Sequence, residues 1–369
     1  MLEPPTQVES VGGGLDFALK SKKMGCLILA GGQASRLKLE VPKGTLPVTL
    51  IKHKSLFQLF FEKAKAVSLR QNDPLPLAIM TSPLNHQATF DFLQKHHFFG
   101  FPLSQIFFFQ QSMLPLEDLN GNQLEVMGPD GNGAALTKFY ESGIWHHWQA
   151  MGIECVNVIP VDNILADPFD AKIDFQGEEI IVKAILRTRP EEQVGVLVQK
   201  EGVLKVLEYT ELPSWVREDK NEEGSLLFSL ANSGLYCFSM SFIEKQRSVE
   251  LPLHRHKKRM KINHIIQDVY KYERFIFDLL PYASNVKILL YPREDSFAPL
   301  KNAEGEDSLK KVQEALLHRD RQLIFQMTGV MPDDHILFEL DPAFYYPIQN
   351  STNQCRVVLN NSYIEKEVC

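Results

Sequence analysis

Short runs of consecutive apolar residues alternate with longer amphipathic segments along the first half of the chain. The apolar runs lie at 26–30, 77–81, 106–109 and 155–161. Continuous runs of this length are typical of strands buried on both faces of a parallel sheet. Between the first two runs, Ser55 and Gln58 form a capping box at the start of a segment whose phenylalanines repeat at helical spacing. This alternation predicts βαβ units and therefore an α/β fold.

The pattern changes from residue 180 onward, where apolar strands are separated by charged turns. Three such stretches lie at 179–186, 194–209 and 226–238, and they predict a mixed extension of the sheet. A helix is expected from Ser308 to about Met327. Residues 347–369 suggest a strand and a charged tail. Residues 1–24 contain a Pro-Pro pair and three consecutive glycines, and they predict no regular structure.

Composition narrows the class of protein. The 369 residues carry a formal net charge of −7, which argues against a nucleic-acid partner. No apolar run approaches the roughly 18–20 residues of a membrane span, and residues 1–24 lack the layout of a signal peptide. The five cysteines are scattered without a CxxC pair, which predicts neither a disulfide framework nor a zinc site. We therefore expect a cytoplasmic protein with no nucleic-acid or membrane partner, and the sequence predicts no oligomeric state.

Candidate chemistry begins directly after the first apolar run. Gly31 and Gly32 end the run, and residues without a Cβ allow the backbone N–H groups to approach a ligand closely. Arg36 and Lys43 follow and could supply charge for polyphosphate oxygens. The alternative is a tight turn flanked by surface cations. The string is neither a P-loop nor a GxGxxG motif.

Asp162 follows the apolar run at 155–161. Burying an unpaired charge is costly, so a carboxylate at the tip of a buried strand should either cap the next turn or hold a cation. The residues themselves leave both readings open.

Several strings resemble one known family. GGQASRLKLEVPKG, at 31–44, resembles the GGxGTRLxxxxPK signature of sugar nucleotidyltransferases. FFQQSMLP, at 108–115, and MGPDGNG, at 127–133, are similar to FFQQGMLP and MAPDGNGG of the UDP-N-acetylhexosamine pyrophosphorylases. REDSFAPLKNA, at 293–303, is close to their REDEFSPLKNA. Ala34 and Ser35 depart from the signature, which usually has glycine and threonine there, and Lys38 stands where the eukaryotic members often have glycine.

The resemblance implies a Rossmann-like, GT-A-like nucleotidyltransferase fold with a mixed central sheet and a small C-terminal extension. It divides the chain into an N-terminal lead-in at 1–24, a catalytic domain at 25–300 and a reduced C-terminal region at 301–369. The implied reaction joins UTP to N-acetylglucosamine 1-phosphate or a related sugar 1-phosphate, with release of pyrophosphate. Two alternatives are a glucose-1-phosphate uridylyltransferase and a non-catalytic sugar-nucleotide-binding protein.

The resemblance also implies roles for individual residues. Asp162 would bind Mg²⁺, so the resemblance favours the cation over the turn cap. Arg36 and Lys43 would hold the β,γ-phosphates, and Lys271 and Lys301 the two phosphates that meet. The nucleotide would contact Leu29, Ala30, Gly31, Gly32, Gln111 and Gly131. The sugar would contact Asn132, Gly195, Glu208 and Asn232.

Structural alternatives remain for some of these residues. Glu208 could be a solvent-facing strand residue, Asn232 a turn former and Lys301 an exposed loop lysine. The basic run HRHKKRMK at 254–261 could lie near the substrate or form a solvated loop. Phe275 and Phe277, shortly after Lys271, are expected on a packed helix face.

Overall fold

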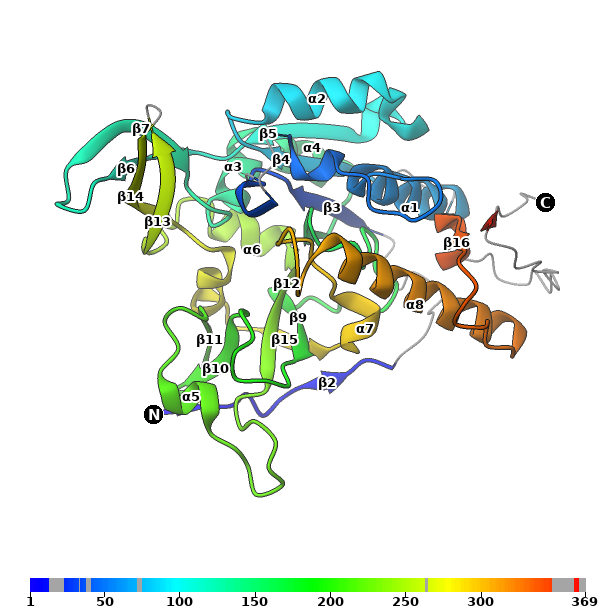
Figure 1. Ribbon diagram of the computed structural model, residues 1–369. Coiled ribbons are helices and arrows are strands. Elements are labelled where there is room, and N and C mark those ends of the chain that lie inside the picture. The colour runs from blue at the N-terminus through cyan, green and yellow to red at the C-terminus, as the bar shows by residue number, and fades with distance from the viewer. Residues whose placement is uncertain are drawn as a thin grey trace.

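The computed structural model describes residues 1–12, 23–32, 34–37, 41–71, 75–262, 265–346 and 362–364. A central sheet of 11 strands runs through this part of the chain in the order β2-β15-β9-β12-β8-β3-β4-β5, and β1, β10 and β11 join it through β12 (Figure 1). Its strands are β1 Leu2–Glu3, β2 Glu9–Ser10, β3 Met24–Leu29, β4 Leu77–Thr81, β5 Ile106–Gln110, β8 Cys155–Pro160, β9 Ile180–Leu186, β10 Val196–Lys200, β11 Val203–Leu207, β12 Leu230–Ser239 and β15 Val286–Leu290.

The part of the central sheet formed by β3, β4, β5 and β8 is parallel. β3 pairs in parallel with β4 and β8, and β4 pairs with β5. Every residue of β3 is buried, as the continuous apolar run predicted. β12 runs antiparallel to both β8 and β9, which makes the sheet mixed. The α/β fold with a mixed central sheet is thus confirmed.

Helices cover both faces of the sheet. They are α1 Leu56–Gln71, α2 His86–Lys95, α3 Ala135–Glu141, α4 Ile144–Ala150, α5 Ser214–Glu218, α6 Met240–Lys245, α7 Arg293–Ser296 and α8 Leu309–Thr328, with 3-10 turns η1 Ser35–Leu37, η2 Lys43–Thr45, η3 His97–Gly100, η4 Leu103–Gln105, η5 Ile276–Tyr282 and η6 Pro342–Tyr345. α1 and α8 share one apolar core with Cys26 and Ile28, whereas α3, α4 and α6 share another with Leu27 and Leu29. Alternate residues of one strand therefore anchor the two layers. No helix in the ranges above is long and apolar enough to span a bilayer.

α1 shows how the sequence forms its own helix. The N–H of Gln58 donates to Ser55 Oγ at 3.1 Å, which confirms the predicted N-cap. The Gln58 side chain does not complete the box, since it donates to Glu62 Oε1 at 2.8 Å instead. Phe57 and Phe61 are fully buried, and burying one such side chain stabilises the fold by about 1.5–3 kcal/mol.

A second, four-stranded sheet has the order β13-β14-β6-β7 and lies apart from the central sheet (Figure 1). Its strands are β6 Met113–Glu117, β7 Gln123–Pro129, β13 His254–Ile262 and β14 Ile265–Glu273. The sequence did not predict the hairpin of β6 and β7. The basic run is not a loop but a strand, because β13 pairs with β14 along its whole length. Phe275 directly precedes the 3-10 turn η5, contrary to the prediction, whereas Phe277 lies within η5 and is buried.

The N-terminal segment was also predicted wrongly. β1 pairs with β10, and β2 pairs with β15. The open edges of a sheet accept any extended backbone, so these pairings need no apolar pattern in the segment. Residues 13–22 lie outside the described residues. So does most of the predicted C-terminal tail, apart from β17 Tyr363–Ile364, which pairs with β16 Glu339–Leu340. The domain boundaries proposed above stay predictions.

Candidate active site

The glycine turn after β3 packs against the end of β5. Asn85 Nδ2 donates to the Ala30 carbonyl at 2.8 Å, and Gln111 Nε2 donates to the Gly31 carbonyl at 3.0 Å. A Cβ on Gly31 would lie 2.5 Å from that Nε2 atom, so a side chain at this position would force the Gln111 amide to move. The fold thus brings Ala30, Gly31 and Gln111 together. Nothing lies within 4 Å of a Cβ built on Gly32.

The other residues of this loop differ in exposure. Leu29 is buried in β3, and Ala34 is buried as well. Arg36 lies in η1 with an exposed side chain. Lys38, which departs from the family signature, lies outside the described residues. Gly32 and Arg36 of this loop are therefore exposed to solvent, whereas Leu29 and Ala34 are buried.

Asp162 forms an ion pair with the next part of the signature. Lys43 Nζ lies 2.9 Å from Asp162 Oδ2. Burial alone would raise the pKa of Asp162, but the charges of Lys43, Lys301 and Arg36 outweigh that effect and hold the pKa below its usual value. Asp162 is therefore ionised at neutral pH. The carboxyl end of β8 thus gathers three of the cations predicted from the sequence around one carboxylate.

Lys301 is positioned by Asn163, a residue that the sequence analysis did not single out. Asn163 Nδ2 donates to the Ser296 carbonyl at 2.7 Å, and its Oδ1 accepts from the Ala298 N–H at 2.9 Å. Lys301 Nζ lies 3.8 Å from Asp307 Oδ2. A buried amide directly after the strand-end aspartate is the signal that could have identified Asn163, since buried amides are usually hydrogen-bonded.

The PDGNG turn is held by the chain that leaves β14. Gly131 has φ of 86°, and a Cβ there would lie 2.3 Å from the Arg274 carbonyl oxygen. Asn132 Oδ1 accepts from the Ile276 N–H at 3.0 Å. Glycine is required at position 131 because the backbone of Arg274, far along the chain, leaves no room for a Cβ. The turn is therefore part of a tertiary contact.

Gly195, Glu208 and Asn232 lie together at the ends of β10, β11 and β12. The Asn232 N–H donates to the Gly195 carbonyl at 2.8 Å, and a Cβ on Gly195 would lie 3.5 Å from Glu208 Oε2. Asn232 Oδ1 accepts from the Tyr236 hydroxyl at 2.6 Å. Burial raises the pKa of Glu208 to about 7, against the opposing charge of Lys301 and together with the like charge of Glu211. Glu208 is thus a partly buried carboxyl that titrates near neutrality.

Lys271 lies on β14 in the smaller sheet. Its Nζ is 2.5 Å from Glu273 Oε1, and a Cβ on Gly128 would lie 3.4 Å from its Cε. Burial lowers the pKa of Lys258, and the charges of Lys271 and Arg36 contribute to the same effect. The charge of Arg36 therefore acts on both Asp162 and Lys258.

Asp162 is the residue that could hold a divalent cation. It supplies one ionised carboxylate, and the described residues contain no group of three or more His, Cys, Asp or Glu side chains arranged around a metal. This donor set fits Mg²⁺, which usually keeps several waters and is held by one or two carboxylates together with substrate phosphates.

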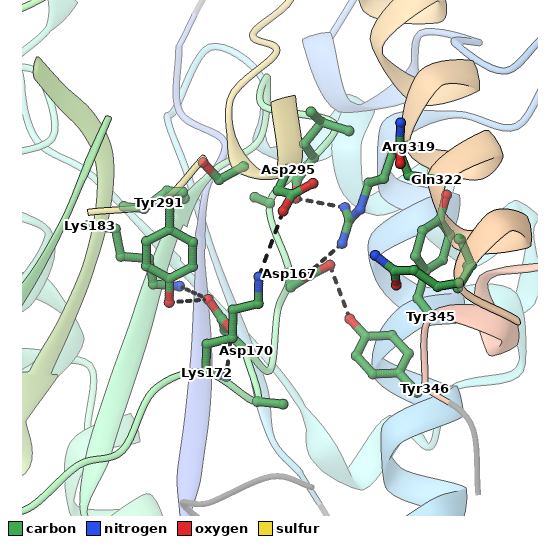
Figure 2. Close-up of a pocket in the computed structure, with 17 residues that line it drawn as sticks. Asp167, Asp170, Lys172, Lys183, Tyr291, Asp295, Arg319, Gln322, Tyr345 and Tyr346 are labelled. Atoms are coloured by element: carbon green, nitrogen blue, oxygen red, sulfur yellow. Dashed lines mark hydrogen bonds and ion pairs between the residues drawn. The ribbon is translucent and has the colours of Figure 1, made fainter. Parts of the chain in front are cut away.

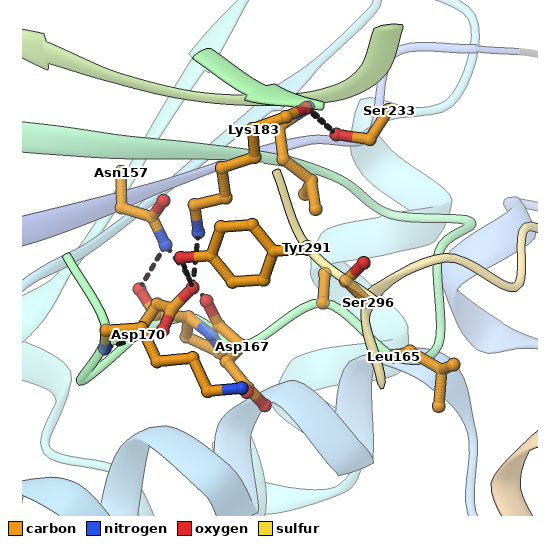
Figure 3. Close-up of polar contacts among 12 residues, drawn as sticks. Asn157, Leu165, Asp167, Asp170, Lys183, Ser233, Tyr291 and Ser296 are labelled. Carbon is orange, nitrogen blue, oxygen red and sulfur yellow. Dashed lines mark hydrogen bonds and ion pairs between the residues drawn. The ribbon is translucent and has the colours of Figure 1, made fainter. Parts of the chain in front are cut away.

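A separate charged cavity lies between the central sheet and α8 (Figure 2). Lys183 Nζ lies 2.9 Å from Asp170 Oδ2, and the Tyr291 hydroxyl donates to the same oxygen at 2.8 Å (Figure 3). On the α8 side, Arg319 Nη2 donates to Asp167 Oδ2 at 2.8 Å. These buried charges neutralise one another, as buried ion pairs must. None of the residues predicted for the site lines this cavity, and we assign it a structural role.

Comparison with known proteins identifies the family. A family model described as UTP-glucose-1-phosphate uridylyltransferase matches residues 16–358. The chain is 32% identical over 324 residues to human UDP-N-acetylhexosamine pyrophosphorylase-like protein 1, which covers 80% of this chain and 64% of that protein. It is 31% identical over 372 aligned positions to UDP-N-acetylglucosamine diphosphorylase 2 of Arabidopsis thaliana, covering 92% of this chain and 74% of that protein. The chain thus spans slightly under two thirds of the human relative.

Solved structures agree with the sequence comparison. A crystal structure of a provisionally named UDP-N-acetylglucosamine pyrophosphorylase from Entamoeba histolytica superposes with a TM-score of 0.80 at 26% identity, covering 95% of this chain and 93% of that one. The UDP-N-acetylglucosamine pyrophosphorylase of Trypanosoma brucei, at 23% identity, shares the fold with a TM-score of 0.78, over 95% of this chain and 80% of that one. The match of the family model over most of the chain, with the two sequence relatives, shows that this protein belongs to the UTP-glucose-1-phosphate uridylyltransferase family.

Proposed function

We propose that this protein is a uridylyltransferase that joins UTP to N-acetylglucosamine 1-phosphate, giving the UDP-sugar and pyrophosphate. The observation that carries the proposal is the ion pair of Lys43 and Asp162 at the carboxyl end of β8, with Lys301 close enough to lower the pKa of Asp162. Ligands of open α/β sheets bind at this edge. The names of the human and Arabidopsis relatives favour an N-acetylhexosamine substrate.

Gln111 is suited to select the base. Its Nε2 is engaged by the Gly31 carbonyl, which leaves Oε1 as an acceptor at a buried strand end. The N3–H of uracil can donate to this oxygen, whereas N3 of cytosine and N1 of adenine carry no hydrogen. A site built to accept one such bond rejects bases that lack the donor.

The charges suit a direct displacement. An oxygen of the sugar phosphate attacks the α-phosphorus of UTP in line, and pyrophosphate leaves. The protein then has to position both phosphates and neutralise the charge that develops, without a covalent nucleophile. Arg36 and Lys43 would hold the β,γ-phosphates, while Lys301 and Lys271 would approach the two phosphates that meet. Asp162 would hold Mg²⁺, which polarises phosphate oxygens when bound.

The sugar would lie against the ends of β10 to β12 and the PDGNG turn. Glu208 and the amide nitrogens of Asn132 and Asn232 offer hydrogen bonds, since both amide oxygens are already engaged within the protein. A Cβ on Gly195 would lie 2.7 Å from Val206 Cγ1, so the absence of a side chain at Gly195 lets this strand end pack closely beside Glu208. Neutral sugars present hydroxyl and amide groups, which such side chains satisfy directly.

A second candidate substrate is glucose 1-phosphate, which the name of the matching family model favours. The experiment is pyrophosphate release from UTP with N-acetylglucosamine 1-phosphate, N-acetylgalactosamine 1-phosphate and glucose 1-phosphate in parallel, with CTP and ATP replacing UTP as controls. We expect the highest kcat/KM with UTP and N-acetylglucosamine 1-phosphate. A higher value with glucose 1-phosphate would support the second candidate. No release with any sugar would indicate a binding protein without turnover, and equal rates with UTP and CTP would contradict the role of Gln111.

We also propose a cytoplasmic location. Cys26 and Cys237 are buried and take part in no disulfide among the described residues, and cysteines outside disulfides are typical of a reducing compartment. Fluorescence microscopy of a tagged full chain tests this proposal.

A further inference from the structure

His254, the first residue of β13, lies between two carboxylates. Its Nδ1 is 3.0 Å from Glu211 Oε1, and its Nε2 is 2.9 Å from Asp278 Oδ2. A neutral imidazole has one N–H and can donate to only one carboxylate, whereas imidazolium donates to both. Both contacts can therefore be hydrogen bonds at the same time only if the three side chains hold one proton more than a neutral ring between two ionised carboxylates.

Each carboxylate belongs to a segment that carries a proposed sugar contact. The Glu211 N–H donates to the Glu208 carbonyl at 2.8 Å, so Glu211 closes the turn that begins at Glu208. Asp278 lies in η5, two residues after Ile276, whose N–H donates to Asn132 Oδ1 at 3.0 Å. His254 thus connects the Glu208 turn with the segment that holds Asn132.

Aromatic packing fixes the ring between its partners. The ring centroids of His254 and Phe275 are 5.0 Å apart, those of His254 and Phe277 are 6.1 Å apart, and the two phenylalanines stack at 4.9 Å. The ring therefore has little freedom to turn away from either carboxylate when its protonation changes.

The charged groups around His254 are mostly acidic. They are Glu208 and Glu211 on the β11 side, Asp278 in η5 and Glu273, the cross-strand partner on β14. Burial would lower the pKa of His254, but its hydrogen bonds to Glu211 and Asp278 and their negative charges raise it above the usual value. Burial also raises the pKa of Asp278. We place the proton on His254, because two carboxylates flank this one ring.

We infer that protonated His254 is a positioning residue for the sugar, which holds the Glu208 turn and the Asn132 segment at a fixed separation. The inference rests on the proposed function and adds a residue that touches neither substrate. Above the pKa of His254 the ring loses one of its two donated bonds, and the sugar-facing wall loosens. Affinity for the sugar part of the ligand should then fall, while affinity for the nucleotide part should not.

The test separates these two parts by calorimetry. Kd is measured for UDP and for UDP-N-acetylglucosamine at about pH 7 and about pH 9, on either side of the range in which histidine titrates. The ratio of the two Kd values reports the contribution of the sugar. In the wild type we expect this contribution to fall roughly tenfold between the two pH values, as for the loss of one charge-assisted hydrogen bond. His254→Gln should show the reduced contribution already at the lower pH.

Glu211→Gln is the decisive variant. Its amide can donate to Nδ1 of a neutral ring while Nε2–H donates to Asp278, so both links form without the extra proton. The variant should keep its sugar contribution at the higher pH. His146→Gln, at an exposed histidine of α4, is the matched control and should behave as the wild type.

Each contrary result has a distinct meaning. A wild-type ratio that does not change with pH would overturn the positioning role. An equal fall in Glu211→Gln would also overturn it, and would assign the pH dependence to Glu208. Binding of UDP with no gain from the sugar would overturn both the sugar site and the inference. Failure to bind either nucleotide would overturn the proposed function itself. If His254→Gln does not fold, Glu211→Gln still tests the inference.

Discussion

Lys43 Nζ and Asp162 Oδ2 lie 2.9 Å apart and join the loop that follows β3 to the end of the neighbouring strand β8. The charge of Lys43 helps to hold the pKa of Asp162 below its usual value. The ion pair can also open to bind two groups at once. A cation can then bind the carboxylate of Asp162, and a phosphate can bind the ammonium of Lys43. We propose that the pair is a preformed site for a phosphate that arrives with its cation.

Asp162→Asn should lower Mg²⁺-dependent turnover by about 100-fold or more, because the amide keeps the shape of the side chain but not the charge. Pyrophosphate release at saturating substrates measures this. Glu222→Gln removes one exposed carboxylate elsewhere and should have no effect. Near-normal activity of Asp162→Asn would return Asp162 to the role of a turn cap.

Gly31→Ala should weaken UTP binding and destabilise the protein. The added Cβ would lie 2.5 Å from Gln111 Nε2, and Gln111 is buried. Overpacking of this kind typically costs about 1–3 kcal/mol. Calorimetry with UTP and urea unfolding measure the two effects. Gly12→Ala is the matched control, because Gly12 is not among the predicted site residues and nothing lies within 4 Å of its Cβ position. If both variants bind UTP equally well, the Gly31 and Gln111 contact has no part in nucleotide binding.

Lys301→Ala should lower kcat by roughly 10²–10³, equivalent to about 2.7–4 kcal/mol, since one electrostatic donor to the transition state is lost. UTP affinity should change by no more than a few-fold, because the lysine acts mainly when both phosphates are present. Steady-state kinetics and calorimetry with UTP separate the two quantities. Lys310→Ala, at an exposed position of α8, serves as the control. Unchanged turnover would make Lys301 an ordinary loop lysine, and lost UTP binding with intact turnover would assign it to the nucleotide.

Glu208→Gln should stabilise the protein at alkaline pH. The pKa of Glu208 is raised from 4.5 to about 7, so the folded state holds a proton that the unfolded state has already released within this window. The free energy of unfolding of the wild type therefore falls as pH rises between these values and then levels off. The amide removes this loss.

Urea unfolding at several pH values measures the gap between variant and wild type, which should widen up to about pH 7. Glu218→Gln, at an exposed glutamate, should follow the wild type throughout. A gap that is the same at every pH would mean that the Glu208 carboxyl is not titrating in this window.

The elements predicted best are those whose pattern reflects burial. The strand that ends at Leu29 and the helix that begins at Leu56 pack against the core on successive or helically spaced residues, and that spacing is visible in the chain itself. Family resemblance then indicated Asp162, Lys43 and Lys301, and the fold brings these three together. Their catalytic roles stay predictions until the variants above are measured.

The second sheet and the N-terminal strands escaped prediction for a common reason. β13 is largely basic, and β1 and β2 contain two residues each, so none of them has a marked apolar pattern. Their stability comes from backbone hydrogen bonds to partners far along the chain, such as β1 to β10. Backbone pairing is almost independent of side-chain type, and a sequence pattern cannot reveal it.

Residue identity along the chain determines which segments bury their side chains and which groups can carry charge or bind phosphate. It does not determine which distant groups meet. Gly31 lies against the Gln111 amide, and the segment that leads to Lys301 is held by Asn163. His254 lies between Glu211 and Asp278. These relationships join residues from different elements, and their distances exist only after the sheets and loops have packed. Local periodicity is a property of neighbouring positions, whereas steric fit and electrostatics depend on distance in space.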